Sequence, residues 1–259
     1  MEQGGIILQQ VLLTALGVGG ATVLGSLLGF AVKKIPHKFN DIILSFAAGI
    51  MMAAAVLGLI LPAVENGGRF GALIAGAGIL CGALFLNFID RFVPHMHTIA
   101  GVSGERQSEN MDQLNKILLF VMAIAIHNVP EGIAAGVSFG TGNVADAFTV
   151  AAGIALQNVP EGMIIIAPML AAGISRRRTF LIALATGLVE VLGTLFGYFA
   201  VSVASFLLPF FLAFAGGTML YVISNDMIPE THNHGYERAA TYALLLGFIV
   251  MLVMDFYIG

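Results

Sequence analysis

Long apolar stretches separated by short polar segments run through the whole chain. Eight of them contain about 20 or more mostly apolar residues, the length that a helix needs to cross a bilayer. They cover approximately residues 6–32, 40–64, 69–92, 116–139, 146–172, 178–203, 206–227 and 238–257. The pattern predicts an all-α polytopic membrane protein with eight transmembrane helices. We expect a single membrane domain over residues 1–259, with residues 93–115 as the loop between the third and fourth helices.

The basic residues lie on alternate loops. Ten of the eleven lysines and arginines fall in or beside the first, third, fifth and seventh loops, and only Arg69 lies on the other side. Loops rich in lysine and arginine stay on the cytoplasmic side of a membrane. This distribution predicts that the odd-numbered loops, including 93–115, are cytoplasmic and that the N- and C-termini are extracytoplasmic.

The composition supports a membrane protein and excludes several other classes. Of 259 residues, 58% are hydrophobic and 10% are charged, whereas a soluble domain has about 45–50% apolar and about 25% charged residues. The net charge of −4 leaves no basic surface for nucleic acid. Cys81 is the single cysteine, which excludes an internal disulfide and an iron–sulfur site, and its apolar neighbours predict a packed thiol.

Small residues recur at four-residue spacing in several predicted helices. Examples are Ala21-Gly25-Gly29, Gly78-Gly82 and Gly193-Gly197. In lipid, such faces let helix backbones approach closely. Packing within one bundle explains them, and they permit a homodimer without requiring one.

A polar phrase occurs twice, in the fourth and fifth predicted helices. The first copy is Ala-Ile-His-Asn-Val-Pro-Glu-Gly over 125–132, and the second is Ala-Leu-Gln-Asn-Val-Pro-Glu-Gly over 155–162. The linker between them is short, so the helices run antiparallel and the copies approach from opposite sides of the bilayer. An inverted repeat with a substrate site near the midplane is a recurring plan among transporters.

Each copy places three polar residues on one helix face, because positions three and four apart are neighbours on a helix. Pro130 and Pro160 remove backbone donors and predict a kink in each helix, and the glycine after each glutamate leaves room for a partner helix. The polar residues are His127, Asn128 and Glu131 in the first copy and Gln157, Asn158 and Glu161 in the second.

Imidazole, carboxylate and amide groups without a thiolate suit a borderline divalent transition metal that is held reversibly. A purely structural polar network is the alternative. It is disfavoured because a charged residue at the bilayer centre costs about 2.5–3.5 kcal/mol on insertion scales. We therefore interpret the six residues as ligands of a metal site near the midplane.

Two further helices offer candidate ligands. Glu190 is the only charge inside the sixth stretch, and we assign it to metal coordination, with helix packing or proton binding as alternatives. Met51 and Met52 sit centrally in the second stretch. A thioether is a soft, labile ligand, although methionine mostly fills core space.

Polar residues also gather at the predicted cytoplasmic ends of the third and seventh helices. A ladder of carboxylates and imidazoles there would pass a cation out of the site, whereas ordinary solvated loop residues are the alternative. The residues are Asp90, His95, His97, Asp226, Glu230, His232 and His234.

The phrase over 127–132 resembles the signature of ZIP (Zrt/Irt-like) metal transporters. The second copy, Glu190 and the Ser-Asn-Asp-Met-Ile-Pro-Glu segment over 224–230 also resemble that family, and eight helices match its plan. Within the family the chain looks most similar to the prokaryotic GufA or zinc-uptake branch. The resemblance implies a transporter and not an enzyme, in the cytoplasmic (inner) membrane of a bacterium or archaeon. It also implies import of zinc, or of iron, manganese, cobalt or cadmium, as substrate and with no cofactor.

The same resemblance implies two adjacent metal positions and an elevator-like slide of a bundle that contains both repeat helices. The principal position would use His127, Glu131, Gln157 and Glu161, with Met51 or Met52 as a further ligand. The second would use Asn128, Asn158 and Glu190 and share the two glutamates of the repeat. Many relatives have histidine in place of Gln157, and some have a carboxylate in place of Asn158. The missing imidazole weakens the preference for zinc and makes the site harder, and the amide in place of a carboxylate weakens the case for a full second metal position.

Other function classes compete with a metal importer. An intramembrane metalloenzyme would need a motif such as His-Glu-x-x-His, which the chain lacks. A secondary transporter of another cation or solute would favour cationic or aromatic groups around its substrate. The helices of the repeat carry no lysine or arginine at depth, and the chain has no tryptophan. A divalent-metal importer is therefore the leading hypothesis.

Overall fold

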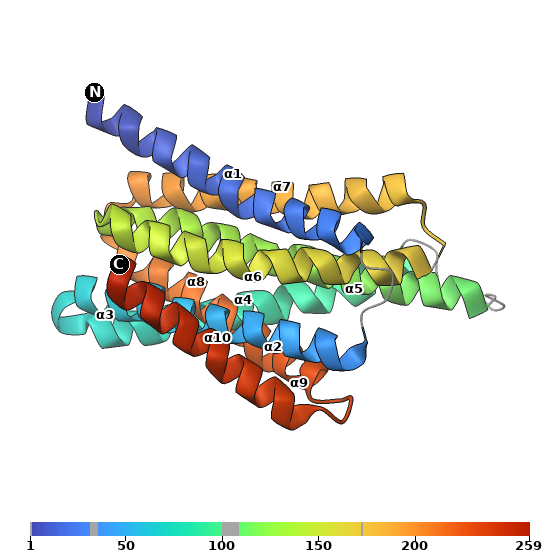
Figure 1. The fold of residues 1–259 in the computed structure, drawn as a ribbon. Coiled ribbons are helices and arrows are strands. Elements are labelled where there is room, and N and C mark those ends of the chain that lie inside the picture. The colour runs from blue at the N-terminus through green and yellow to red at the C-terminus, as the bar shows by residue number, and fades with distance from the viewer. Residues whose placement is uncertain (1, 32–35, 100–108, 172) are drawn as a thin grey trace.

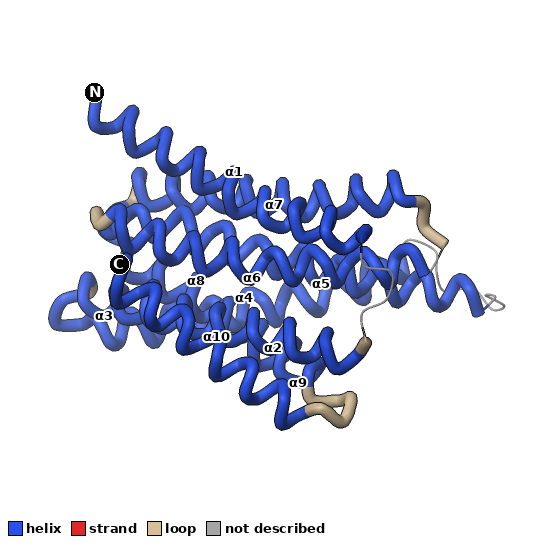
Figure 2. The backbone as a smooth tube through the Cα atoms, in the orientation of Figure 1, coloured by secondary structure: helices blue, strands red, loops and turns tan. Residues whose placement is uncertain are grey.

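A computed structural model describes residues 2–31, 36–99, 109–171 and 173–259. Of residues 2–4, 90–99, 109–121 and 123 it describes the backbone alone. Within these ranges the secondary structure is helical, and short turns join the helices at the ends of the bundle (Figure 2). The all-α prediction is confirmed.

The helices of the described ranges group into eight continuous units, one for each predicted apolar stretch. Four of the units change helix type along their length, through short π or 3₁₀ segments. The units are α1 (Glu2–Ala31), α2–η1–α3 (His37–Ala53, Ala54–Ile60, Leu61–Asn66), η2–α4 (Gly68–Phe70, Gly71–Ile99), α5 (Glu109–Ser138) with η3 (Phe139–Thr141), α6 (Val144–Ala171), α7 (Arg176–Val203), η4–α8–η5–α9 (Ser205–Leu207, Leu208–Val222, Ile223–Met227, Ile228–Thr231) and α10 (Glu237–Ile258).

Seven of these units are long and apolar enough to cross a membrane, judged on the described residues alone. The remaining unit, α5, is 30 residues long and includes positions without described side chains. Helix covers part of the predicted loop over 93–115, because α4 continues to Ile99 and α5 begins at Glu109, and the bounds of the cytoplasmic segment stay a prediction. Hydropathy marks where the apolar surface ends, whereas a helix continues as long as its backbone hydrogen bonds are made.

The helices pack as two bundles, which we call the first and the second bundle. The first bundle contains α1, α5, α6 and α7, and the second contains α2–α3, α4, α8–α9 and α10. Figure 1 shows α1 and α7 along one side of the molecule and α2 and α10 along the other, with α5 and α6 between them. Both termini lie at the same end, as an even number of crossings requires (Figure 1).

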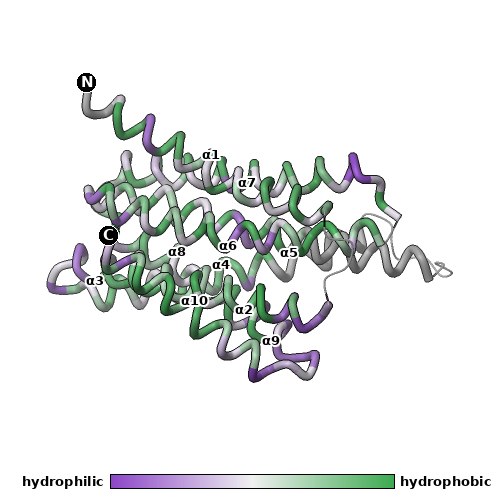
Figure 3. Tube along the Cα trace, viewed as in Figure 1, coloured by the Kyte–Doolittle hydropathy of each residue, from purple (hydrophilic) through white to green (hydrophobic). Residues whose placement is uncertain are grey.

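Polar residues concentrate at the helix ends, and apolar residues cover much of the length between them (Figure 3). Leu73, Leu192 and Phe196 are among the large apolar side chains that are more than half exposed, as expected for a lipid-facing surface. Cys81 also lies on the exposed surface of α4, so the predicted packed thiol is wrong. An apolar neighbourhood in sequence does not separate the core from the lipid, because both are apolar.

The small-residue faces are used inside the monomer. A Cβ atom added at Gly25 would collide with the Val159 carbonyl of α6, and one at Gly82 would collide with the Phe214 carbonyl of α8. These close approaches join helices within one bundle. The faces that permitted a homodimer are therefore already occupied, and a dimer stays a prediction.

The prolines of the repeat lie inside helices. Both α5 and α6 continue as α-helices through Pro130 and Pro160, and a kink at either position stays a prediction. The irregular segments lie in the second bundle, where the π-helices η1 and η5 each end two residues before a proline, Pro62 or Pro229. A π turn shifts the hydrogen-bond register by one residue, so it accommodates a missing donor, and it often marks a functional site.

Candidate metal site

The two copies of the repeat meet at the centre of the first bundle. Since α5 and α6 run antiparallel, the start of one phrase lies beside the end of the other. The Gln157 Nε2 atom donates a hydrogen bond to Glu131 Oε1 over 2.8 Å, and both side chains are fully buried. The predicted convergence of these two residues is thus present in the structure.

Glu190 joins the same buried layer from α7. Its Oε1 atom accepts a hydrogen bond from the Asn158 amide of α6, and its Oε2 atom accepts one from the Thr22 hydroxyl of α1 over 3.1 Å. Asn128 donates to the Thr186 carbonyl of α7 over 3.3 Å. The polar layer therefore spans all four helices of the first bundle. Thr22 was absent from the sequence interpretation, because a lone threonine in a glycine-rich helix carries no distinguishing signal.

Glycine allows these helices to approach closely enough for such contacts. A Cβ at Gly132 would collide with the Glu190 carbonyl of α7, and a Cβ at Gly162 would collide with the Thr22 carbonyl of α1. The glycine after each glutamate thus leaves room for a partner helix, as the sequence predicts. The partner helix is α7 for the first copy and α1 for the second.

Several acceptors of this layer have no hydrogen-bond partner. They are buried oxygen atoms of four side chains, Oδ1 of Asn128, Oε2 of Glu131, Oε1 of Gln157 and Oδ1 of Asn158. Buried polar atoms are normally satisfied, and each exception calls for an explanation. Because all four are acceptors, a bound cation would satisfy them together.

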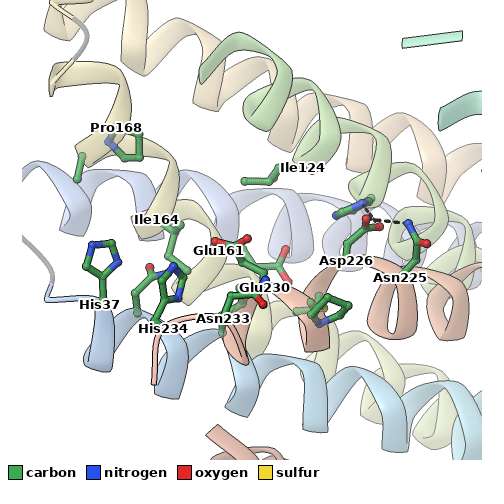
Figure 4. Close-up of a pocket in the computed structure, with 16 residues that line it drawn as sticks. His37, Ile124, Glu161, Ile164, Pro168, Asn225, Asp226, Glu230, Asn233 and His234 are labelled. Atoms are coloured by element: carbon green, nitrogen blue, oxygen red, sulfur yellow. Dashed lines mark hydrogen bonds and ion pairs between the residues drawn. The ribbon is translucent and has the colours of Figure 1, made fainter. Parts of the chain in front are cut away.

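A cavity of about 640 Å³ opens beside this layer, between the two bundles. His127 and Glu161 line it from the first bundle, and Asp226 and Glu230 line it from the second. The close-up in Figure 4 shows Glu161, Asp226 and Glu230 among the labelled residues of this cavity. The His127 Nε2 atom lies 3.3 Å from Asp226 Oδ2. Two of the predicted exit residues therefore do share a cavity with two residues of the repeat.

The structure brings together only part of the predicted ligand set. Glu131 and Gln157 are paired inside the first bundle, whereas His127 and Glu161 face the cavity. Within the described part of the chain, no three His, Cys, Asp or Glu side chains are close enough to hold a metal ion. Met51 is buried in the main core cluster and Met52 packs against it, and a role for either in metal binding stays a prediction.

Several other exit residues differ from Asp226 and Glu230. His232 is engaged in capping, since its Nδ1 atom lies 2.9 Å from the Ile228 carbonyl and its Nε2 atom lies 3.2 Å from the Thr241 hydroxyl. It is not among the residues that line the cavity, and its place on the exit path stays a prediction. The side chains of Asp90, His95 and His97 lie outside the described residues.

A histidine and an asparagine that were assigned no separate role from sequence, His37 and Asn225, also line the cavity, as does His234 of the predicted exit ladder. The His234 Nδ1 atom lies 3.1 Å from Oδ1 of the buried Asp41, and the His37 and His234 rings stack with their centroids 4.9 Å apart. Their positions near helix ends resembled ordinary loop polarity, and only the packing of α2 against α9 brings them together.

The comparison with known proteins agrees with this geometry. A family model described as ZIP Zinc transporter matches residues 101–255. The chain belongs to the ZIP zinc transporter family. ZIP proteins are membrane transporters and not enzymes, so the metalloenzyme alternative has no support from the family.

Individual ZIP relatives cover nearly the whole chain. It is 41% identical to Zinc transporter GufA of Myxococcus xanthus, over 96% of this chain and 98% of the relative. It is 37% identical to Zinc transporter ZIPB of Bordetella bronchiseptica, over 92% of this chain and 78% of the relative. It is 31% identical to Zinc transporter ZupT of Chlorobaculum parvum, over 91% of this chain and 92% of the relative. The similarity to the prokaryotic GufA branch is confirmed.

Proposed function

We propose that the protein imports divalent transition metal ions, zinc first, across a bacterial or archaeal cytoplasmic membrane. The observation that carries this proposal is the buried layer of α1, α5, α6 and α7, in which four acceptor oxygens have no partner. In an apolar environment such atoms are costly unless a cation or donor satisfies them. The named zinc transporters among the relatives support zinc as the first choice.

The donor set supports a transition metal over a hard cation such as calcium. His127 supplies an imidazole at the cavity, Glu131, Glu161 and Glu190 supply carboxylates, and the amide oxygens add harder character. The layer and the cavity lie side by side, so an ion in the layer has a water-accessible route to one face of the membrane. This mixture suits zinc while admitting iron or manganese.

The charge pattern supports cytoplasmic exposure of the cavity. His37 and His234 line it, and they lie beside Lys38 and Arg238 in loops that the positive-inside rule assigns to the cytoplasm. The described conformation is accordingly the one that releases metal inward. Both termini then face outward.

The packing supports a sliding movement of the first bundle against the second. The layer lies within the first bundle, and small residues in both bundles face side chains of the other. A Cβ at Gly58 would meet the Val150 side chain, and one at Gly153 would meet the Met251 side chain. Contacts through apolar side chains can be exchanged during a slide, whereas the backbone contacts within each bundle keep it rigid.

Zinc uptake into proteoliposomes tests this function. Wild type is compared with His127→Ala and Glu131→Ala over zinc, iron, manganese and cadmium, and exposed Glu237→Ala serves as a control for the loss of one carboxylate. We expect both site variants to lose uptake and the control to keep it. Uptake that survives in both site variants would show that the repeat is structural.

A further inference from the structure

One polar contact connects the two bundles. Among pairs in which both side chains are described, His127 of α5 and Asp226 of η5 make the single hydrogen bond or ion pair between them. The other polar contacts of the central layer, such as Gln157 to Glu131 and Asn158 to Glu190, stay inside the first bundle. Any movement of one bundle against the other must therefore break or remake the His127–Asp226 contact.

The Asp226 carboxylate is held in place for this contact. Its Oδ1 atom accepts a hydrogen bond from Asn225 Nδ2 over 3.0 Å, while Oδ2 faces His127. Both residues lie in the π segment η5, just before Pro229. A π turn redirects the side chains that it carries, and here it places both Asn225 and Asp226 on the wall of the cavity.

The contact occupies an atom that a metal would need. His127 Nε2 and Asp226 Oδ2, 3.3 Å apart, form an ion pair when the imidazole is protonated, and a protonated nitrogen has no lone pair to offer a metal ion. While Asp226 holds Nε2, that nitrogen of His127 is not available to the buried layer. This agrees with the absence of any group of three ionisable ligands within metal-binding distance among the described residues.

We propose that Asp226, oriented by Asn225, is a positioning residue that competes with the transported metal for His127. The inference rests on the proposed function. With the site empty, Asp226 draws His127 toward the second bundle and latches the bundles in the described conformation. A metal ion on His127 excludes this contact, so the contact forms as the metal leaves in the described conformation, and it breaks again when the empty first bundle returns outward. On the release side, Asp226 takes the imidazole back and displaces the departing ion.

A latch and an exit ligand predict opposite effects of removing Asp226. If Asp226 only received the metal on its way out, its loss would leave binding at the central site unchanged or weaker. If it competes for His127, its loss removes the competitor. Binding then becomes tighter, and the maximal uptake rate falls because metal release is slower.

The experiment measures equilibrium zinc binding to the full-length protein in detergent by competition with a fluorescent chelator, and initial uptake rates in proteoliposomes. We expect Asp226→Ala to bind zinc about tenfold more tightly, since the ion-pair contact with His127 is lost from the empty state. KM and the maximal rate should both fall. Asn225→Ala, which leaves the carboxylate but removes its orienting donor, should shift both in the same direction by less. Glu237→Ala is the matched control and should change neither.

A second arm identifies His127 as the group through which Asp226 acts. In a His127→Ala background, the further change Asp226→Ala should have no effect on zinc affinity. Weaker or unchanged binding in Asp226→Ala, or the same gain in both backgrounds, would overturn the latch. Failure of the proposed function is distinct, because the wild-type protein would then show no zinc uptake at all.

Discussion

The two copies of the repeated phrase share five of six residues from 127–132 and 157–162, yet the protein places them in different surroundings. In the first copy, the opening residue His127 faces the cavity and the glutamate Glu131 is buried. In the second copy, the opening residue Gln157 is buried and the glutamate Glu161 lines the cavity. The buried position and the cavity-lining position are therefore exchanged between the two copies.

The reversal follows from the antiparallel crossing of α5 and α6. The opening residue of one copy lies at the level of the glutamate of the other, as the Gln157–Glu131 hydrogen bond shows. Each level therefore holds one glutamate and one opening residue, and only one level borders the cavity. A near-identical phrase thus supplies a buried pair and an accessible pair, and a metal ion must contact both levels to use the whole ligand set.

Loss of either glutamate charge tests whether both levels hold the metal. Glu131→Gln and Glu161→Gln should each lower zinc uptake at least about 100-fold, because a carboxylate ligand is lost. The amide keeps the shape and an acceptor oxygen, so the melting temperature of the metal-free protein should stay near that of wild type. Differential scanning fluorimetry with and without zinc measures both. If Glu161→Gln keeps the thermal stabilisation by zinc, the accessible level is not part of the site.

Exchange of the opening residues sharpens the comparison. Gln157→His adds an imidazole at the buried level and should raise the preference for zinc over manganese about tenfold, because imidazole favours zinc. His127→Gln removes the accessible imidazole and should lower that preference by a similar factor. Competition uptake assays with both ions measure the ratio. A ratio in Gln157→His equal to that of wild type would mean that position 157 does not contact the ion.

The glycines after the glutamates test whether both copies are packed alike. Gly132→Ala and Gly162→Ala each force a methyl group against a backbone carbonyl, and we expect a loss of about 1–3 kcal/mol of stability in each. Gly20→Ala on α1 is the matched control, since a Cβ there meets nothing within 4 Å. It should be neutral or should stabilise the helix by up to about 1 kcal/mol. Thermal unfolding in detergent shows whether the two copies differ.

Proton competition gives the smallest effect. Carboxylate and imidazole ligands must lose their protons to bind a metal, so the KM for zinc should rise severalfold as the external medium is made more acidic. The maximal rate should change less, because saturating zinc displaces the protons. Uptake measured over a zinc series at several external pH values separates the two parameters. A KM that falls in acid would contradict a site built on these carboxylates.

The sequence predicted the helices well because the bilayer imposes a strong and local constraint. Every backbone polar group in lipid must be satisfied within its own helix. An apolar stretch of sufficient length therefore predicts a transmembrane helix directly. The polar phrases were equally visible, because charged residues such as Glu131, Glu161 and Glu190 are rare inside such stretches. The short linker between the two phrases then indicated an inverted repeat. The fold class and the carboxylate and amide residues of the central layer therefore required no structure, whereas Thr22 of the same layer did.

Tertiary packing alone decided how those residues divide. The sequence could not separate the buried Gln157 from the cavity-lining His127, because which level of the crossing meets the second bundle depends on contacts between distant segments. It could not show that His232 is held by backbone and threonine, or that Asn225 orients Asp226 toward α5. Local pattern reports what each helix must bury. Which surfaces then face a partner helix, the lipid or a water-filled cavity is set by how the two bundles fit together.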